Sequence, residues 1–377
     1  MKRILFITAF VPSRIGAGEN FSRRLINDLA VQNYIDLICF KYSYNEDYII
    51  ESNNVKVLKT FSNSLIIKLL NYVMFPFLFP LFVVRFNLNR LFFIKKAVRK
   101  YHYDLLIFDF SQTFLFSKFI HGIPKVFYSQ DVIAQRYSRI YWGIFVPFVR
   151  LSEKFVLNSD NVKIFTPSEK DSKIIKQLYS IETTVTDIYL DQYVMNSIPD
   201  VNGNYFVLFA NWNRPDNSYG LKWFLKYVYP ELNKELNFKI IGTGLPNNGN
   251  GVYNKGVYPN LEYLGFVDNP YPVISNARAL ISPLFTGAGV KVKVIESLAC
   301  GTSVIGTDLS FEGISDKYSS FMKVARSRED FVSVINNFQT ELSEKLELKK
   351  LFINTYNNKG ISGYINSRQF PGRYEKN

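Results

Sequence analysis

The stretch GAGVKVKVIESLACG, from Gly287 to Gly301, decides the fold, because it fits either a strand or a loop that leads into a helix. Its middle alternates valine and lysine, as a half-buried strand does. However, ALISPL before it and SVIGTD after it are typical of parallel strands, and two such strands in one sheet need a crossover helix between them. We therefore predict a glycine loop, a helix over about residues 292–300, and Gly301 as its C-terminal cap.

This placement puts Lys291 and Lys293 at a helix N-terminus. Positive charge there opposes the helix dipole by about 0.3–1 kcal/mol per charge, so stability alone does not favour it. A bound anion would make the lysine charges favourable at this position. Gly287 and Gly289 would free the backbone to wrap a diphosphate. Glu296, one turn further along, suits a neutral polyol such as ribose. The alternative is a solvated basic turn with a surface glutamate.

The rest of the chain alternates apolar runs with amphipathic stretches, a pattern typical of parallel sheets covered by helices. The series breaks at about residues 185–202 and then begins again. We predict an α/β fold of two Rossmann-like domains that face each other across a cleft, over residues 1–190 and 200–355. One amphipathic helix is expected over about residues 329–356, and the tail over residues 356–377 could pack back on the first domain.

The net charge of +13 is concentrated in the first domain, where residues 1–190 carry +10. Residues 52–103 hold nine basic side chains and no acidic one. Within them, LLNYVMFPFLFPLFVV (residues 69–84) is too short and too broken by proline to cross a membrane, which takes about 20 apolar residues. We favour a surface that dips into an anionic membrane; two buried helices with a solvated basic face are the alternative. No nucleic-acid-binding motif accompanies the charge, so nucleic acid is not expected as a partner.

The first loop, VPSRIGAGENF, places Gly16 and Gly18 between a strand and a helix. Phe21 occupies the third glycine position of a dinucleotide fingerprint, so nicotinamide and flavin dinucleotides are disfavoured. A lone GxG fits a tight turn as well as a ligand contact. Cys39 and Cys300 are far apart and have no metal-ligand spacing, which indicates a reducing, cytoplasmic compartment.

At this point the motifs resemble a known family. GAGVKVKVIESLACGTSVIGTD followed by FEG resembles the nucleotide-sugar-binding segment of GT-B glycosyltransferases of the group-1, family-4 type. NWNRPDNSYGLKWFLKYVYPEL, IIGTG and LGFVDN stand in the order that this family shows. The N-terminal GAGEN resembles its glycine loop, and SEKFVLNSDNVKIFTPSEKD resembles the segment that closes its first domain.

The resemblance implies roles for individual residues. The donor diphosphate would lie over Gly287–Lys293, Glu296 would hold the ribose hydroxyls, and Gly265–Val267 would border the base. Arg214, with Lys291 or Lys293, would neutralise the leaving diphosphate, so Arg214 and Lys293 are predicted to be catalytic. The predicted nucleotide-sugar-binding residues are Gly16, Gly18, Arg214, Gly242, Gly265, Phe266, Val267, Gly287, Ala288, Gly289, Val290, Lys291, Lys293 and Glu296.

Two positions depart from the family pattern. Ala288 stands where many relatives have a glutamate that binds the donor sugar, and Gln130 beside Asp131 stands where many have a histidine. Asp131 is the first domain's candidate for a catalytic role facing the reacting sugar; it fits an N-cap of the following helix equally well. No DxD-type motif occurs in a suitable loop, so we expect neither a metal nor a cofactor besides the nucleotide-sugar co-substrate.

The predicted function is transfer of a sugar from a UDP- or GDP-sugar to a lipid-linked or other glycan acceptor, in bacterial surface polysaccharide synthesis at the cytoplasmic face of the membrane. Retention of anomeric configuration is implied by the resemblance alone. One alternative is a GT-B nucleotide-sugar epimerase, for which a membrane-docking region has little purpose. The other is a non-catalytic nucleotide-sugar-binding subunit of an assembly complex.

Overall fold

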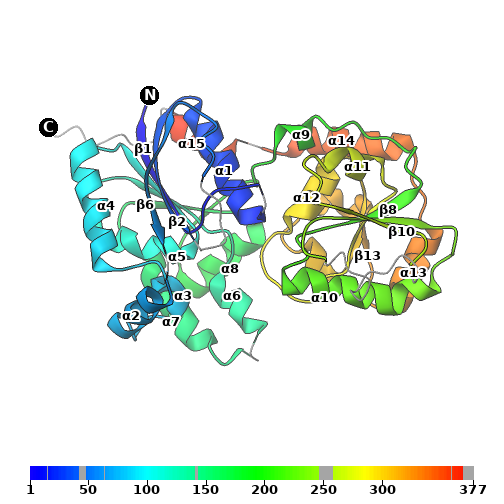
Figure 1. Ribbon diagram of the computed structural model, residues 1–377, viewed down its shortest axis with the longest axis horizontal. Coiled ribbons are helices and arrows are strands. Elements are labelled where there is room, and N and C mark those ends of the chain that lie inside the picture. The colour runs from blue at the N-terminus through cyan, green and yellow to red at the C-terminus, as the bar shows by residue number, and fades with distance from the viewer. Residues whose placement is uncertain are drawn as a thin grey trace. The chain divides into compact units, whose positions relative to one another are not determined.

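The computed structural model describes residues 1–14, 16–41, 48–62, 64–140, 143–245, 258–357 and 359–367. The chain divides into two compact units (Figure 1). The first unit consists of Met1–Tyr189 together with Asn357–Asn377, and the second unit of Leu190–Tyr356. The chain therefore leaves the first unit once and returns to it near its end.

The first unit is built on a parallel sheet, which within the described residues has seven strands in the order β3-β2-β1-β4-β5-β6-β7. These strands are β1 (Arg3–Thr8), β2 (Tyr34–Lys41), β3 (Val55–Ser62), β4 (Leu105–Asp109), β5 (Lys125–Tyr128), β6 (Val162–Thr166) and β7 (Thr184–Val185). The two-residue edge strand β7 lies at the start of the stretch that the sequence marked as irregular.

Helices connect the strands of the first unit. They are α1 (Ala17–Ala30), α2 (Leu65–Met74), α3 (Pro80–Val83), α4 (Leu88–Tyr101), α5 (Ser111–Phe114), the 3-10 helix η1 (Leu115–Phe119), α6 (Ile133–Ser138), α7 (Val146–Leu157), α8 (Glu169–Tyr179) and α15 (Gly360–Asn366). Helix α15 comes from the C-terminal end of the chain and packs beside α1 (Figure 1). Asn33 Nδ2 donates a hydrogen bond to Asn366 Oδ1 at 2.9 Å, which fixes this contact.

The second unit also has a parallel sheet, in the order β10-β9-β8-β11-β12-β13 within the described residues. Its strands are β8 (Tyr205–Phe209), β9 (Asn237–Ile241), β10 (Leu261–Gly265), β11 (Leu280–Ser282), β12 (Val304–Gly306) and β13 (Met322–Val324). Its helical segments are α9 (Gln192–Met195), α10 (Pro215–Trp223), the π-helical turn η3 (Phe224–Val228), η4 (Tyr229–Glu231), α11 (Tyr271–Asn276), α12 (Val292–Ala299), η5 (Asp308–Phe311), η6 (Asp316–Phe321), α13 (Arg328–Asn337) and α14 (Leu342–Thr355).

The prediction for the stretch 287–301 is confirmed. The residues after β11 form a loop, α12 begins at Val292, and β11 pairs in parallel with β12. Gly301 has φ +74°, the left-handed conformation expected of a helix C-terminal cap. A Cβ atom at Gly301 would lie 2.6 Å from the carbonyl oxygen of Lys345, so packing also requires glycine there.

Two predictions need correction. The helix expected over residues 329–356 is two helices, α13 and α14, each with its own N-terminal capping box, at Ser327 and at Glu341. The apolar stretch 69–84 does not form one exposed surface, because Phe82 and Val83 lie in the core of the first unit. None of the helices in the described part of the chain is both long and apolar enough to cross a membrane.

Two of the nine basic residues within residues 52–103 are buried in the first unit and hold backbone groups there. Arg85 and Arg90 are buried, and the Arg90 guanidinium donates hydrogen bonds to the carbonyl oxygens of Arg85 and Ser62 at 2.7 and 2.6 Å. Burial, together with the charge of Arg85, lowers the pKa of Arg90 to about 10. These two guanidinium groups cannot reach lipid headgroups.

Each sheet has one point where the strand order reverses. In the first unit it lies between β1 and β4, and in the second between β8 and β11. In open α/β sheets, ligands bind in the crevice at the carboxyl ends of the strands at such a point, because the connecting loops diverge there. The fold therefore marks one loop cluster in each unit as a candidate site.

Candidate active site

The loop between β11 and α12 occupies the reversal point of the second unit. Gly287 and Gly289 have φ values of +114° and +69°, which side-chain-bearing residues rarely adopt. Lys291 is the N-cap of α12, and its side chain makes no capping hydrogen bond; its Nζ donates instead to the carbonyl oxygen of Gly289 at 2.6 Å. The first amides of α12 thus face this loop without a side-chain cap from Lys291. Ala288 and Val290 complete the loop.

Lys293 lies in the first turn of α12. Its Nζ donates to Asn217 Oδ1 at 3.2 Å, and Asn217 Nδ2 in turn donates to the carbonyl oxygen of Asn211 at 2.9 Å. Burial, then the positive charges of Lys291 and Arg214, lowers the pKa of Lys293 to about 7. An anion at this place would relieve both the desolvation and the repulsion.

Arg214 comes from the other strand at the reversal point. It follows β8 as the N-cap of α10, and its side chain is exposed. The structure therefore brings Arg214, at the start of α10, close enough to Lys291 and Lys293, at the start of α12, for their charges to interact. Asp216, in the first turn of α10, accepts a hydrogen bond from Thr286 Oγ1 at 2.7 Å, which ties these loops together.

Glu296 lies one turn further along α12 and is buried. The hydroxyl of Tyr271, on α11, donates to Glu296 Oε1 at 3.0 Å. This bond fixes the carboxylate and leaves it acceptor capacity for sugar hydroxyls.

The remaining predicted residues of the second unit lie at the ends of β9 and β10. Gly242 has φ +126°, and a Cβ atom there would lie 1.7 Å from the carbonyl oxygen of Ala210. Its amide donates to the carbonyl oxygen of Gly265 at 2.8 Å. Phe266 is exposed and Val267 half-buried, so a flat apolar group could contact this edge. Glycine at 242 is thus required by close packing, whatever its ligand role.

Gly16, Gly18 and Asp131 belong to the first unit. Gly16 is the N-cap of α1, and the carboxylate of Glu19 lies against its Cα. Asp131 is partly buried, and its Oδ2 lies 3.8 Å from Arg136. The N-cap alternative for Asp131 is wrong, because the N-cap residue of α6 is Val132, and the first amides of α6 donate to Glu153 instead of Asp131. A catalytic role for Asp131 stays a prediction.

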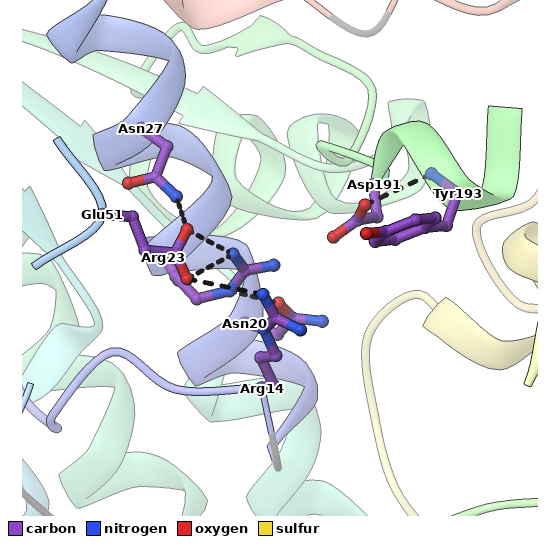
Figure 2. A network of polar contacts seen from close by, with 7 residues as sticks. All are labelled: Arg14, Asn20, Arg23, Asn27, Glu51, Asp191 and Tyr193. Carbon is purple, nitrogen blue, oxygen red and sulfur yellow. Dashed lines mark hydrogen bonds and ion pairs between the residues drawn. The ribbon is translucent and has the colours of Figure 1, made fainter. Parts of the chain in front are cut away.

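A polar network holds the first loop against α1 (Figure 2). The carboxylate of Glu51 accepts hydrogen bonds from Arg23 at 2.8 and 3.0 Å and from Asn27, and it lies 3.8 Å from Arg14. Arg23 Nε also donates to Asn20 at 3.1 Å. Arg14 lies in the loop between β1 and α1, so this network restrains the loop that carries Gly16.

Comparisons with known proteins identify a family for part of the chain and a fold for the whole. Residues 203–340 match the family described as glycosyl transferases group 1, which covers both strands at the reversal point of the second unit. Residues 203–340 therefore form a group 1 glycosyltransferase domain, and the chain has the GT-B fold. No curated protein sequence is significantly similar to it.

Solved structures resemble this glycosyltransferase over nearly its whole length. Sucrose-phosphate synthase from Thermosynechococcus elongatus is 12% identical with a TM-score of 0.73, and the match covers 97% of each chain. HepE from Anabaena, solved in complex with UDP, is 13% identical with a TM-score of 0.66, over 97% of this chain and 99% of the other. WaaG, a glycosyltransferase involved in lipopolysaccharide biosynthesis, is 11% identical with a TM-score of 0.63, over 96% and 98%. At such identities the likeness shows the fold.

The sequence analysis of this glycosyltransferase missed two buried acids. Glu153, on α7, accepts hydrogen bonds from the amides of Ile133 and Ala134 at 2.8 and 2.9 Å and so caps α6 from a distance. Burial raises the pKa of Glu153 to about 7. Asp109, the last residue of β4, is fully buried at the reversal point of the first unit. Asp109 could have been predicted as a buried acid, because it ends the apolar run DLLIFD. No sequence pattern around Glu153 predicts its burial.

Within the described residues, no group of three or more His, Cys, Asp or Glu side chains is placed to hold a metal ion.

Proposed function

We propose that this glycosyltransferase takes its sugar from a UDP- or GDP-sugar and passes it, without a metal ion and with retention of configuration, to a lipid-linked glycan in surface polysaccharide synthesis. The carrying observation is the cluster of Arg214, Lys291 and Lys293 beside a glycine loop, in which Lys293 is held at a pKa near 7. Such a cluster destabilises the protein alone and is favourable once a diphosphate lies among its charges.

The proposed chemistry follows from this arrangement. As the bond between sugar and phosphate breaks, negative charge grows on the leaving diphosphate. Lys293 and Arg214 would stabilise that charge, and the backbone amides of the loop from Gly287 would add hydrogen bonds. Glu296, held by Tyr271, would accept hydrogen bonds from the ribose hydroxyls. HepE, a protein of the same fold, was solved with UDP, which supports a uridine donor.

The donor is tested with purified protein and a panel of UDP-, GDP- and ADP-sugars. We expect one nucleoside diphosphate to raise the melting temperature, because a ligand that binds only the folded state stabilises it, and its sugar to be hydrolysed slowly. Binding without turnover of any donor would instead support the non-catalytic subunit. Release of nucleotide with an isomerised free sugar, under conditions that yield no transfer, would support the epimerase.

The acceptor side of the proposal rests on helix α2. Five of its apolar residues recur on one helical face, and each of these five is more than half exposed. These residues are Leu65, Ile66, Leu69, Leu70 and Val73, and Phe77 follows them with similar exposure. Helix α2 packs on α3, and α3 packs on α7, whose Arg150 and Lys154 are exposed (Figure 1). An apolar face on a segment, residues 52–103, that holds basic side chains and no acidic one fits the surface of an anionic membrane.

This surface is tested by co-sedimentation with vesicles of phosphatidylglycerol and phosphatidylcholine. The double variant Leu69→Asp/Val73→Asp is expected to lose most vesicle binding while donor hydrolysis stays unchanged. The matched control is Leu346→Asp/Ile353→Asp on α14, where two apolar residues are similarly exposed in the second unit. Equal loss in both variants, or no loss in either, would remove the membrane from the proposal.

A further inference from the structure

Asn217 is a polar residue of the second unit to which the reaction proposed above gives no role. It lies in the first turn of α10, where its backbone amide donates to the carbonyl oxygen of Arg214 at 3.1 Å. Its side chain is partly buried and contacts two segments, the residues that follow β8 and the first turn of α12. The carboxamide makes one hydrogen bond to each of these segments.

The orientation of this carboxamide is fixed by the backbone. Asn217 Nδ2 donates to the carbonyl oxygen of Asn211 at 2.9 Å, and a carbonyl oxygen can only accept. The peptide group of that carbonyl is held as well, because its N–H, which belongs to Trp212, donates to the carbonyl oxygen of Thr243 at 2.8 Å. The NH₂ group of Asn217 must therefore face Asn211, and its Oδ1 must face away from it.

Asn217 Oδ1 faces Lys293. The Nζ of Lys293 donates to this oxygen at 3.2 Å, and among the described residues no other acceptor lies within hydrogen-bond distance of the amine. A lysine side chain is a flexible stem, so one fixed acceptor restricts where its charge can lie. Asn217 thus determines the position of the Lys293 amine beside the glycine loop.

This contact joins a basic group to a neutral one. Burial, and after it the positive charges of Lys291 and Arg214, lowers the pKa of Lys293 to about 7. An aspartate has nearly the shape of asparagine, and its negative charge would favour the ammonium form of Lys293 and so stabilise the cluster. Stability alone therefore favours aspartate at position 217, but the chain has asparagine there.

Acidic side chains of the neighbouring segments are engaged with other groups. Each of three carboxylates has a partner other than Lys293. These pairs are Asp216 with Thr286 at 2.7 Å, Glu296 with Tyr271 at 3.0 Å, and Glu312 with Lys291 at 4.0 Å. Among the described residues, Lys293 is therefore held in place by a carboxamide and not by a carboxylate.

We propose that Asn217 is a positioning residue that holds the amine of Lys293 at the donor diphosphate without compensating its positive charge. A carboxylate at the same place would pair with the ammonium group and repel the diphosphate, since like charges repel strongly where water is partly excluded. A carboxamide accepts the hydrogen bond and leaves the charge available to the leaving group. This inference rests on the proposed role of Lys293, and it concerns the second unit alone.

Asn217→Asp adds the missing charge and is the most specific test. The carboxylate should keep Lys293 charged between pH 6 and pH 8, so binding of the UDP- or GDP-sugar that stabilises the wild type most should no longer take up a proton at pH 8. The affinity of the variant should be equal at both pH values, whereas that of the wild type should fall by about tenfold because Lys293 has a pKa of about 7. Calorimetry measures both quantities. Proton uptake or pH dependence as in the wild type would overturn the proposal.

The matched control is Asn336→Asp on α13. Asn336 is exposed, and its Oδ1 accepts a hydrogen bond from the amide of Asn233 at 2.9 Å, which an aspartate can also do. This variant adds the same charge to the second unit and should keep the proton uptake and affinity of the wild type. Equal changes in both variants would show that net charge, and not the contact with Lys293, is responsible, and would also overturn the proposal.

Asn217→Ala removes the acceptor without adding charge, which keeps the proposal testable if Asn217→Asp folds poorly. We expect kcat/KM for donor hydrolysis to fall about tenfold, and Asn217→Ala/Lys293→Ala to lose no more than Lys293→Ala, because Asn217 acts through Lys293. A double loss equal to the product of the single losses would overturn this inference alone. So would full activity of Asn217→Ala beside an impaired Lys293→Ala. Full activity of Lys293→Ala would overturn both this inference and the proposed role of Lys293.

Discussion

The two reversal points of this glycosyltransferase share a topology and differ in chemistry. In the second unit, Arg214, Lys291 and Lys293 lie near glycines with positive φ, and the charges of Lys291 and Arg214 help to lower the pKa of Lys293. In the first unit, the buried acid Asp109 and the carboxamide of Gln130 occupy the equivalent crevice, and the nearby Gly18 makes room for a side chain. The comparison teaches that a GxG after a strand does not by itself predict an anion site, because the side chains around the glycines differ: they are cationic in the second unit, and a buried acid in the first.

The largest effect is expected from removal of the central cation of the second unit. Lys293→Ala should lower kcat/KM for donor hydrolysis by about 10²–10³, since it removes a fixed charge from the leaving diphosphate. The measurement is steady-state hydrolysis. Lys226→Ala, an exposed lysine on η3, is the control and should be neutral. If Lys293→Ala kept full activity, Lys293 would not stabilise the leaving diphosphate, and the difference in charge between the two reversal points would not matter for catalysis.

A smaller loss is expected when the polyol contact is weakened. Glu296→Gln should reduce nucleotide-sugar affinity about tenfold, because hydrogen bonds to a charged acceptor are worth roughly 1.5–3 kcal/mol. Titration calorimetry gives the dissociation constant. Tyr271→Phe, which removes only the hydroxyl that holds Glu296, should show a weaker form of the same defect. Unaltered affinity in both variants would show that Glu296 does not contact the donor.

Proton uptake on donor binding tests whether Lys293 interacts with the diphosphate. Lys293 has a pKa of about 7 in the free protein, so it is mostly neutral at pH 8 and mostly charged at pH 6. A bound diphosphate favours the charged form, so binding of a UDP- or GDP-sugar should take up close to one proton at pH 8 and few at pH 6, and affinity should fall as the pH rises through 7. Calorimetry in buffers of different ionisation enthalpy measures this uptake, and Lys293→Met should abolish it.

The smallest effect concerns the stability of the first unit. Burial raises the pKa of Asp109 to about 7, so the folded state holds this proton more tightly than the unfolded state. Its contribution to stability therefore falls as the pH rises from about 4 to about 7. Asp109→Asn removes that penalty and should raise the melting temperature by a few degrees at pH 8, and by less at pH 5. Asp36→Asn, which loses the ion pair with Arg3, should lower it at both values. Identical shifts of the Asp109 variant at both pH values would contradict a buried, titrating carboxyl.

The sequence by itself determined what depends on local periodicity and chain order. Alternating apolar and amphipathic runs were enough for the α/β fold, and the two strands around GAGVKVKVIESLACG required the crossover helix α12. The loop glycines and the lysines beside a helix N-terminus were also local, because dipole and charge act within one turn. The predicted roles of the individual site residues in donor binding remain to be measured.

Only the tertiary structure decided what depends on partners distant in sequence. Glu153 caps α6 from α7, Arg90 is buried although it lies in a basic segment, and Gln130, after β5, donates a hydrogen bond to Asp109 at the end of β4. Each side chain alone looks like a surface charge or a plain helix residue. Its role follows from burial, since a desolvated polar group must find its partner wherever the fold brings one, and no local pattern records where that is.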